Sequence, residues 1–234
     1  MTGFDAHTDF VEGRTLLIDK PIEWSSFDVV KKIRNVICRK YNLEKLRVGH
    51  AGTLDPLATG LMIICTGKAT KQIGSYQEME KEYVATLKLG ESTPSFDLET
   101  DPDHSYPTEH ITRALVVSTL ETMKGESMQI PPVFSAKRLQ GKRAYDFARQ
   151  GKEPKMRPHP IHVSEIEIMN FDIPELKIRI RCSKGTYIRS IARDLGKALK
   201  TGAHITALRR TRIGTFTVEK ALSPQKFEET LNKL

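Results

Sequence analysis

The segment with the clearest chemical potential is residues 49–60, which read Gly-His-Ala-Gly-Thr-Leu-Asp-Pro-Leu-Ala-Thr-Gly. Its single acid, Asp55, stands among glycines, small residues and one proline. Glycine reaches backbone dihedrals that other residues avoid, and proline fixes its own φ, so such a segment can place one carboxylate accurately. A carboxylate placed in this way could act as a nucleophile or a general base. Taken alone, however, the segment favours an ordinary turn, because Asp-Pro and glycine-rich dipeptides are common in turns.

Several other chemistries lack their usual residues. The chain has no Gly-x-x-x-x-Gly-Lys-Ser/Thr loop and no Gly-x-Gly-x-x-Gly, the segments that cradle the phosphates of nucleotides and dinucleotide cofactors. No His-x-x-x-His or Cys/His cluster offers a metal site. An aspartate that is phosphorylated normally has a second acid beside it to hold magnesium, whereas Asp55 is followed closely by Leu57 and Ala58. We therefore expect aspartate chemistry with no cofactor and no metal.

Composition points to a polyanionic partner. The 234 residues include 37 Lys and Arg against 29 Asp and Glu, a formal net charge of +8. This excess favours RNA or DNA over a membrane. The three cysteines lie far apart and indicate neither a disulfide framework nor a zinc site. With no signal peptide and no apolar run long enough to span a bilayer, we expect a cytoplasmic protein that does not associate with membranes.

The elements around Asp55 can be read from hydrophobic periodicity. Residues 16–18 predict a short buried strand, and Ser25 or Ser26 can cap a following helix with an apolar stripe. Residues 61–65 predict a buried strand directly after the Asp55 loop. Alternation over 82–89, with Tyr83 on the apolar face, predicts another strand. Rigid elements should therefore hold the Asp55 loop.

The second half of the chain alternates strands and helices without a regular βαβ rhythm. Residues 111–123 and a segment from about 186 predict helices, and 176–182 and 203–208 predict strands. Residues 1–13 predict a loose arm, and the acidic segment 91–109 a surface loop. We expect one α/β (α+β) domain over 14–234, with a mixed, mainly antiparallel sheet flanked by helices and loops.

Five ordered blocks carry a family resemblance. They are Lys20-Pro21 with Ser25-Ser26, residues 49–60, Lys81-Glu82-Tyr83 with Leu89-Gly90, Pro131-Pro132 through Gly151, and Cys182 through Ser190 with Gly202 through Arg210. Together they resemble the TruB family, the bacterial tRNA pseudouridine-55 synthases. The resemblance extends over about 200 residues and replaces the turn interpretation of Asp55 with a catalytic one.

The resemblance implies the pseudouridine synthase fold and a reaction. Asp55 matches the family's catalytic aspartate, which attacks a flipped-out uridine in the T arm of tRNA, at C1′ or at C6. The C1′–N1 bond breaks, and the uracil rotates and rejoins through C5. Flipping the base out of its stack costs a few kcal/mol, so the enzyme must hold the base once it is extruded.

Other residues inherit expected roles from the family motifs. Tyr83 matches the tyrosine that stacks on the flipped base, and Arg189 matches the arginine that pairs with the catalytic aspartate. A third group matches residues at the RNA interface or in the uridine pocket, namely His50, Tyr187 and Leu208. Lys20, grouped with them as a substrate-binding candidate, should either support the loop or contact RNA. Candidate contacts to RNA phosphates are Arg179, Arg181, Lys184, Arg209 and Arg210.

The chain departs from the family pattern in several places. Glu23 replaces a glycine, Ser25 replaces a threonine, Phe134 replaces a tyrosine, and Pro94 and Ser95 alter the motif after Gly90. We also expect no C-terminal PUA domain, the RNA-binding module of many members, because the sequence ends soon after Phe216. A monomer should suffice for the reaction.

Two alternatives remain beside tRNA pseudouridine-55 synthesis. The basic surface would also suit an RNA chaperone that unfolds and refolds the tRNA elbow, although binding alone does not need Asp55. A related synthase acting on another RNA would use the same residues.

Overall fold

The computed structural model describes residues 8–135, 137–139, 142–148, 154 and 156–234. Part of the fourth motif block, including Gly141 and Gly151, lies outside these residues. The chain forms two compact units. Unit 1 comprises residues 1–83 and 208–234, and unit 2 comprises residues 84–207. Each is described by itself.

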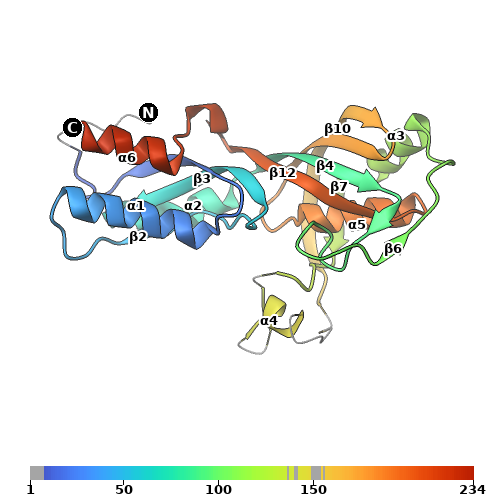
Figure 1. Ribbon diagram of the computed structural model, residues 1–234, viewed down its shortest axis with the longest axis horizontal. Coiled ribbons are helices and arrows are strands. Elements are labelled where there is room, and N and C mark those ends of the chain that lie inside the picture. Colours follow the sequence, from blue (N-terminus) through green and yellow to red (C-terminus); the bar gives the residue numbers. More distant parts are fainter. Residues whose placement is uncertain (1–7, 136, 140–141, 149–153, 155) are drawn as a thin grey trace. The chain divides into compact units, whose positions relative to one another are not determined.

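Unit 1 is a small sheet with helices (Figure 1). Its elements are β1 (Thr15–Lys20), α1 (Ser26–Lys40), β2 (Val48–His50), β3 (Ala58–Thr66), the 3-10 helix η1 (Gly67–Gln72), α2 (Ile73–Glu78), the start of β4 (Lys81–Leu89), the end of β12 (Ala203–Ile213), β13 (Phe216–Thr217), the 3-10 helix η2 (Val218–Lys220) and α6 (Pro224–Asn232). The central strand β3 pairs antiparallel with β1 and β2, and parallel with β12.

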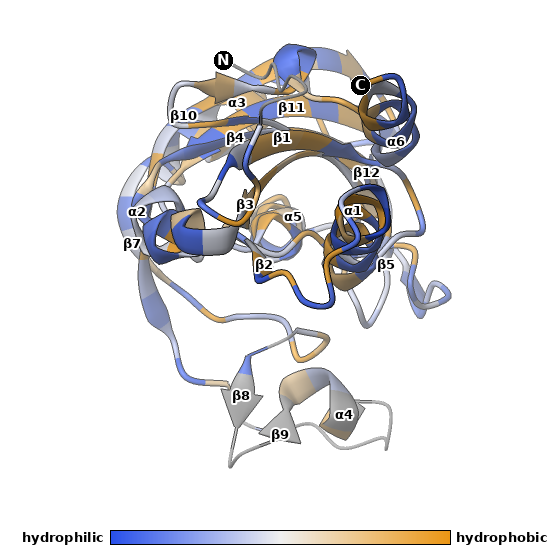
Figure 2. Cartoon of the chain, turned by 90° about the vertical axis from the view of Figure 1, so that its left-hand side faces the viewer, coloured by the Kyte–Doolittle hydropathy of each residue, from blue (hydrophilic) through white to orange (hydrophobic). Residues whose placement is uncertain are grey.

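The core of unit 1 forms where the sequence is most apolar. Leu61 through Cys65 are at most 1 % exposed, and β1 contributes the three buried apolar side chains of residues 16–18. Helix α1 begins with a capping box between Ser25 and Asp28 and buries the stripe of Val29, Val30, Ile33, Val36 and Ile37. Figure 2 shows this pattern as orange strands β1 and β3 beside a helix α1 with both apolar and polar faces. Helix α6 contacts α1, where Lys32 and Glu228 form an ion pair.

Unit 2 is built on antiparallel strands. Its elements are the rest of β4 and β12, β5 (Glu91–Ser92), β6 (His104–Ser105), α3 (Arg113–Thr122), β7 (Gly125–Gln129), β8 (Arg138–Leu139), β9 (Lys142–Arg143), α4 (Ala144–Ala148), β10 (His159–Asp172), β11 (Glu175–Cys182) and α5 (Ile188–Ala198). Strands β4, β11, β10 and β7 are neighbours in that order. Strand β11 buries Leu176, Ile178, Ile180 and Cys182, as its alternation predicts.

Most of the predicted elements are confirmed, and so is the mixed, mainly antiparallel sheet. The N-terminal arm is partly wrong. Residues 1–7 lie outside the described part, but Phe10 is buried and its ring contacts Tyr41 and Phe227. The buried Phe10 ring, a hydrogen bond from the Lys68 N–H to the Val11 carbonyl oxygen and the Lys68–Glu12 ion pair attach this segment to unit 1.

The predicted surface loop at 91–109 is also partly wrong. Strands β5 and β6 form a short hairpin, and Thr93, Ser95 and Asp97 are buried between them. Strand β12 runs five residues beyond the predicted 203–208, so Arg209 and Arg210 lie within a strand. In the described part of the chain, no helix has both the length and the apolar character needed to cross a membrane.

Candidate functional site

Asp55 lies on the connection between β2 and β3 in unit 1. Strand β2 ends at His50 and β3 begins at Ala58, whose N–H donates to the Asp55 carbonyl at 3.0 Å. The Asp55 side chain is half-buried. Gly60 has φ +108°, and a Cβ there would lie 2.3 Å from the Arg210 carbonyl oxygen. The glycine therefore lets β3 and β12 approach closely immediately behind the loop.

Lys20 holds the loop from β1. Its ammonium donates to three carbonyl oxygens, those of Pro21 (3.0 Å), Trp24 (2.6 Å) and Pro56 (3.1 Å). Lys20 is 0 % exposed, and this burial lowers the pKa of its ammonium to about 8, although the charge of Asp55 opposes the shift. Of the two roles expected for Lys20, the structure supports the first: the side chain is enclosed and holds the loop through three bonds to backbone, and this enclosure argues against direct contact with RNA.

Arg210 holds the loop from β12. Its guanidinium donates to the carbonyl oxygens of Leu61 (2.7 Å), Gly52 (3.1 Å) and Thr53 (3.4 Å). The residue is 1 % exposed. The expected phosphate contact of Arg210 is therefore wrong, because RNA cannot reach a guanidinium that is enclosed and bonded to the loop backbone.

Ser26 provides a third anchor, from the first turn of α1. Its hydroxyl donates to the Leu54 carbonyl oxygen at 3.0 Å and accepts from the Leu54 N–H at 2.9 Å. Nearby, Glu23 has φ +67°, and its N–H donates to the Pro56 carbonyl oxygen. Glu23 thus adopts the left-handed conformation that glycine adopts readily, so the turn forms despite the substitution.

His50 and Leu208 flank the Asp55 loop within unit 1. His50 ends β2 opposite Ile64 of β3, and burial lowers the pKa of its imidazole, so the ring is neutral at pH 7. Leu208 lies opposite Ala58 of β3 and is half-buried. The structure therefore places both residues on strands that pair with β3, next to the segment that carries Asp55.

The neighbour of Arg210 in the sequence has a different environment. Arg209 forms a bidentate ion pair with Asp19, with distances of 3.1 and 2.7 Å from its two terminal nitrogens to the carboxylate. Its side chain is partly exposed. Arg209 can therefore reach RNA only in competition with Asp19.

In unit 2, Arg189 lies on the first turn of α5. The residue is 3 % exposed, and its Nε lies 3.4 Å from Oδ2 of Asp97, which is itself 5 % exposed. The Arg189 guanidinium also donates to the Ser95 carbonyl oxygen at 3.2 Å. Burial of an arginine requires charged or polar partners, and residues 95–97 supply them.

Tyr187 caps the same helix and is fixed through its backbone. The buried side chain of Gln129 accepts from the Tyr187 N–H at 2.8 Å and donates to the Tyr187 carbonyl oxygen at 3.2 Å. The Tyr187 ring packs edge-on against His159, with centroids 6.0 Å apart. These two hydrogen bonds to the side-chain amide of Gln129 fix the backbone from which the half-buried Tyr187 ring projects.

The other predicted site residues lie on strands β4 and β11 and the turn after β11. Tyr83 is buried at 9 % exposure on the apolar face of β4. Arg179 and Arg181 both pair with Glu165 of β10, with nitrogen–oxygen distances of 2.8 Å. Lys184 is exposed on the turn that leads to α5. Of these cations, Lys184 is the most accessible to a phosphate.

Within unit 1, the structure gathers Lys20, His50, Asp55, Leu208 and Arg210 around one loop, and within unit 2 it brings Tyr187 and Arg189 to one end of α5. Sequence reasoning missed the side chains that position these groups, namely Ser26, Asp97 and Gln129. Asp97 was hidden because it belongs to an acidic run that looks solvated. Ser26 was expected as a possible helix cap and as part of the first motif block, with no role in holding the Asp55 loop.

In this arrangement, side chains other than Asp55 hold the loop that presents the Asp55 carboxylate. Buried cations and a hydroxyl bond the backbone of residues 52–56 and leave Asp55 half-buried. A fixed acid of this kind suits nucleophilic attack, because its orientation costs no entropy at the moment of reaction.

Two family models match the chain and together cover most of it. Residues 39–188 match the N-terminal domain of the TruB family pseudouridylate synthases. Residues 189–233 match the C-terminal domain of tRNA pseudouridylate synthase B.

Sequence relatives and solved structures agree with these models. The chain is 56 % identical over 225 residues to a protein of Phocaeicola vulgatus named tRNA pseudouridine synthase B, covering 96 % of both. It is 48 % identical to the protein of that name from Flavobacterium johnsoniae, covering 95 % of this chain and 98 % of the other. A chain of a Cbf5–Nop10–Gar1 complex has a TM-score of 0.67 at 29 % identity, with 91 % of this chain and 52 % of that chain covered. The protein belongs to the TruB family of pseudouridylate synthases.

Proposed function

We propose that this chain isomerises uridine 55 in the T arm of tRNA to pseudouridine, with Asp55 as the nucleophile. The observation that carries the proposal is the loop of residues 49–60, whose backbone is held by Lys20, Ser26 and Arg210. The names of relatives that are 48–56 % identical over nearly their whole length support tRNA as the substrate.

The reaction conserves every atom of the nucleotide. Asp55 attacks either C1′ of the ribose or C6 of the base, and the C1′–N1 bond breaks. The detached uracil rotates, a C1′–C5 bond forms, C5 loses its proton and N1 gains one. One carboxylate is enough for this sequence, whereas ordinary glycoside hydrolysis uses a pair.

The remaining family-matched residues assist the flipped base. Tyr83 stacks on it, Arg189 pairs with the Asp55 carboxylate, and His50, Tyr187 and Leu208 line the site. Stacking on an aromatic ring contributes about 1–3 kcal/mol per base. Arg179, Arg181, Lys184 and Arg209 are candidate phosphate contacts, and Lys184 is the most exposed of them.

The test follows tritium release from unmodified tRNA that carries [5-³H]uridine, since isomerisation expels the C5 hydrogen. We expect Asp55→Asn to lower the rate at least about a thousandfold, because removing a nucleophile removes the covalent route. The dissociation constant for tRNA should change little. Asp101→Asn, an exposed acid of unit 2, serves as the matched control and should keep full activity.

Appreciable turnover by Asp55→Asn would contradict the nucleophile assignment. Mapping of pseudouridine in cellular RNA with and without the gene then tests the substrate. Loss of the modification at tRNA position 55 supports the proposal, whereas loss confined to another RNA identifies a related synthase. If the Asp55→Asn variant fully rescues a deletion strain, the result would favour the alternative in which the protein acts as an RNA chaperone.

We also infer that the protein works as a monomer, since the proposed reaction assigns no role to a second copy, and that it works in the cytoplasm, where its proposed tRNA substrate is found. Light scattering after size-exclusion chromatography, with and without tRNA, tests the first point. A dimer that persists at the enzyme concentration of the assay would contradict it.

A further inference from the structure

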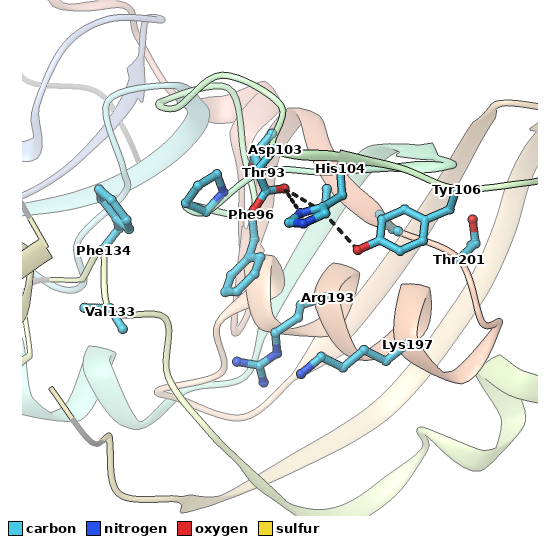
Figure 3. Close-up of a pocket in the computed structure, with 14 residues that line it drawn as sticks. Thr93, Phe96, Asp103, His104, Tyr106, Val133, Phe134, Arg193, Lys197 and Thr201 are labelled. Carbon is cyan, nitrogen blue, oxygen red and sulfur yellow. Dashed lines mark hydrogen bonds and ion pairs between the residues drawn. The ribbon is translucent and has the colours of Figure 1, made fainter. Parts of the chain in front are cut away.

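Unit 2 contains a cavity that the proposed reaction does not use. Its volume is about 580 Å³, within the range of small-molecule and nucleotide sites. Its walls include Phe96, Tyr106, Phe134, Arg193, Lys197 and the Asp103–His104 pair. In Figure 3, Phe96 and Tyr106 lie on two sides of this space, and Arg193 and Lys197 reach toward it from α5. We call it the Phe96 cavity.

The Phe96 backbone is strained. Phe96 has φ +62°, a conformation that is a genuine outlier for a bulky residue. Surrounding bonds enforce it, because the Ile205 N–H donates to the Phe96 carbonyl oxygen at 3.0 Å and the Phe96 N–H donates to Thr93 at 3.1 Å. Strain of this kind persists only where the surroundings over-determine it, and it concentrates at functional sites.

The strained turn separates two side chains. Asp97 is directed to the buried Arg189, while the half-buried Phe96 ring lines the cavity. The Arg193 guanidinium lies over the Phe96 ring, 5.3 Å from its centroid, and its nitrogens pair with Asp194 at 2.7 and 3.1 Å. Arg193 therefore extends a flat aromatic wall rather than offering a full charge.

The polar groups of the cavity fit a nucleotide better than a simple anion. Lys197 is exposed at its rim and supplies a positive charge for a phosphate. Asp103 accepts from the Ser92 hydroxyl at 2.6 Å and lies 3.3 Å from the His104 ring. A carboxylate repels a free anion but accepts hydrogen bonds from the amino group of a base edge. The aromatic rings can stack on the face of a base, Lys197 can bind its phosphate, and Asp103 can accept a hydrogen bond from its edge. Together these groups match one nucleotide.

We propose that the Phe96 cavity holds one nucleotide of the substrate RNA other than the reacting uridine. Its base stacks against the wall of Phe96 and Arg193, its edge donates to Asp103, and its phosphate contacts Lys197. The proposal rests on RNA being the substrate, and it adds a second point of recognition to the one at Asp55.

The test is a binding cycle with a T-arm hairpin in which each loop nucleotide outside position 55 is made abasic in turn. For the wild-type protein, we expect one position to lose about 5- to 150-fold in affinity. Phe96→Gly removes the ring and suits the left-handed backbone, so it should weaken binding of the intact hairpin by a similar factor. Making the sensitive nucleotide abasic should then cause no further loss of affinity in this variant. Phe96→Asn, which also tolerates this φ, repeats the test with a side chain present.

Lys197→Ala should reduce the slope of log Kd against log salt concentration by about 0.7 to 1, the loss of one phosphate contact. Lys200→Ala is the matched control: Lys200 is exposed just beyond the same helix and does not line the cavity. Equal abasic penalties for wild type and both Phe96 variants, or equal salt slopes for Lys197→Ala and Lys200→Ala, would overturn the proposal. Tritium release by the wild-type protein distinguishes failure of this proposal from failure of the proposed function. If the wild-type protein forms pseudouridine but the Phe96 and Lys197 variants bind RNA as the wild type does, only the proposal for the Phe96 cavity is contradicted.

Discussion

The two loops that carry the important carboxylates are held in opposite ways. In the loop of residues 49–60, buried cations bond backbone carbonyl oxygens, and Asp55 stays half-buried. In the hairpin of residues 91–105, Asp97 is buried and forms an ion pair with Arg189. The backbone is the anchor in the first loop, and the acid itself is part of the anchor in the second.

This difference separates positioning from reactivity. The loop around Asp55 keeps its backbone bonds whatever the Asp55 carboxylate contacts, whereas Asp97 cannot leave the buried Arg189 without a large cost. The same contrast divides the arginines of β12: Arg210 is enclosed and bonds the Asp55 loop, while Arg209 pairs with Asp19 at partial exposure.

The largest effect should come from breaking the buried pair. We expect Asp97→Ala to destabilise the protein by about 3–5 kcal/mol, because the buried Arg189 would lose the carboxylate that lies 3.4 Å from its Nε. Asp55→Ala should cost less, because its side chain is only half-buried. Urea unfolding of both variants measures the difference. Equal losses would mean that Asp55 also serves as a structural anchor.

Removing the backbone anchor should have the next largest effect. Arg210→Met retains much of the aliphatic volume but leaves three carbonyl oxygens without their cation, which should cost about 2–4 kcal/mol. The rate of pseudouridine formation at saturating tRNA should also fall, because residues 52–53 lose their tether. Arg210→Lys should recover part of both losses. Full activity in a destabilised Arg210→Met protein would show that the loop needs no tether.

The pH dependence of stability tests Lys20. Its pKa is lowered to about 8 in the fold, against 10.5 in the unfolded chain, so the unfolded state binds more protons between those values. By linkage, the Lys20 contribution makes the protein more stable as pH rises from about 8 to 10.5, by at most roughly 3 kcal/mol. Lys20→Met should abolish this part of the slope.

The measurement is the difference in unfolding free energy between wild type and Lys20→Met at pH 7.5, 9 and 10. Taking the difference cancels the titration of groups that the two proteins share. A difference that does not change with pH would contradict the burial of a charged ammonium beneath the loop.

The smallest effect should come from the neighbour of Arg210. Arg209→Met breaks a partly exposed ion pair with Asp19 and should cost only about 0–1 kcal/mol. Thermal unfolding beside Arg210→Met compares the two arginines directly. If Arg209→Met lowers stability as much as Arg210→Met does, the two arginines contribute equally to the fold and the contrast between them is wrong.

Local sequence predicted those parts of the site whose geometry is encoded locally. Strand alternation placed Tyr83 on the buried face of β4, and Ser25 capped α1 as its residue type suggested. The glycines and proline of residues 49–60 marked a specialised loop around Asp55, because their dihedral preferences act at short range. Family resemblance then supplied the reaction, which no periodicity could have given.

Partners distant in the sequence could not be predicted from it. The residues of each pair lie between 36 and 158 positions apart in the sequence. The pairs are Lys20 with Pro56, Gly52 with Arg210, and Asp97 with Arg189. Arg210 looked like a phosphate contact and Asp97 like a solvated acid, because a charged residue type does not reveal whether it will be buried. The sequence by itself determined that a single aspartate sits in a loop built for accurate placement. Only the tertiary structure decided which cations hold that loop, because burial and hydrogen bonding depend on elements brought together by folding.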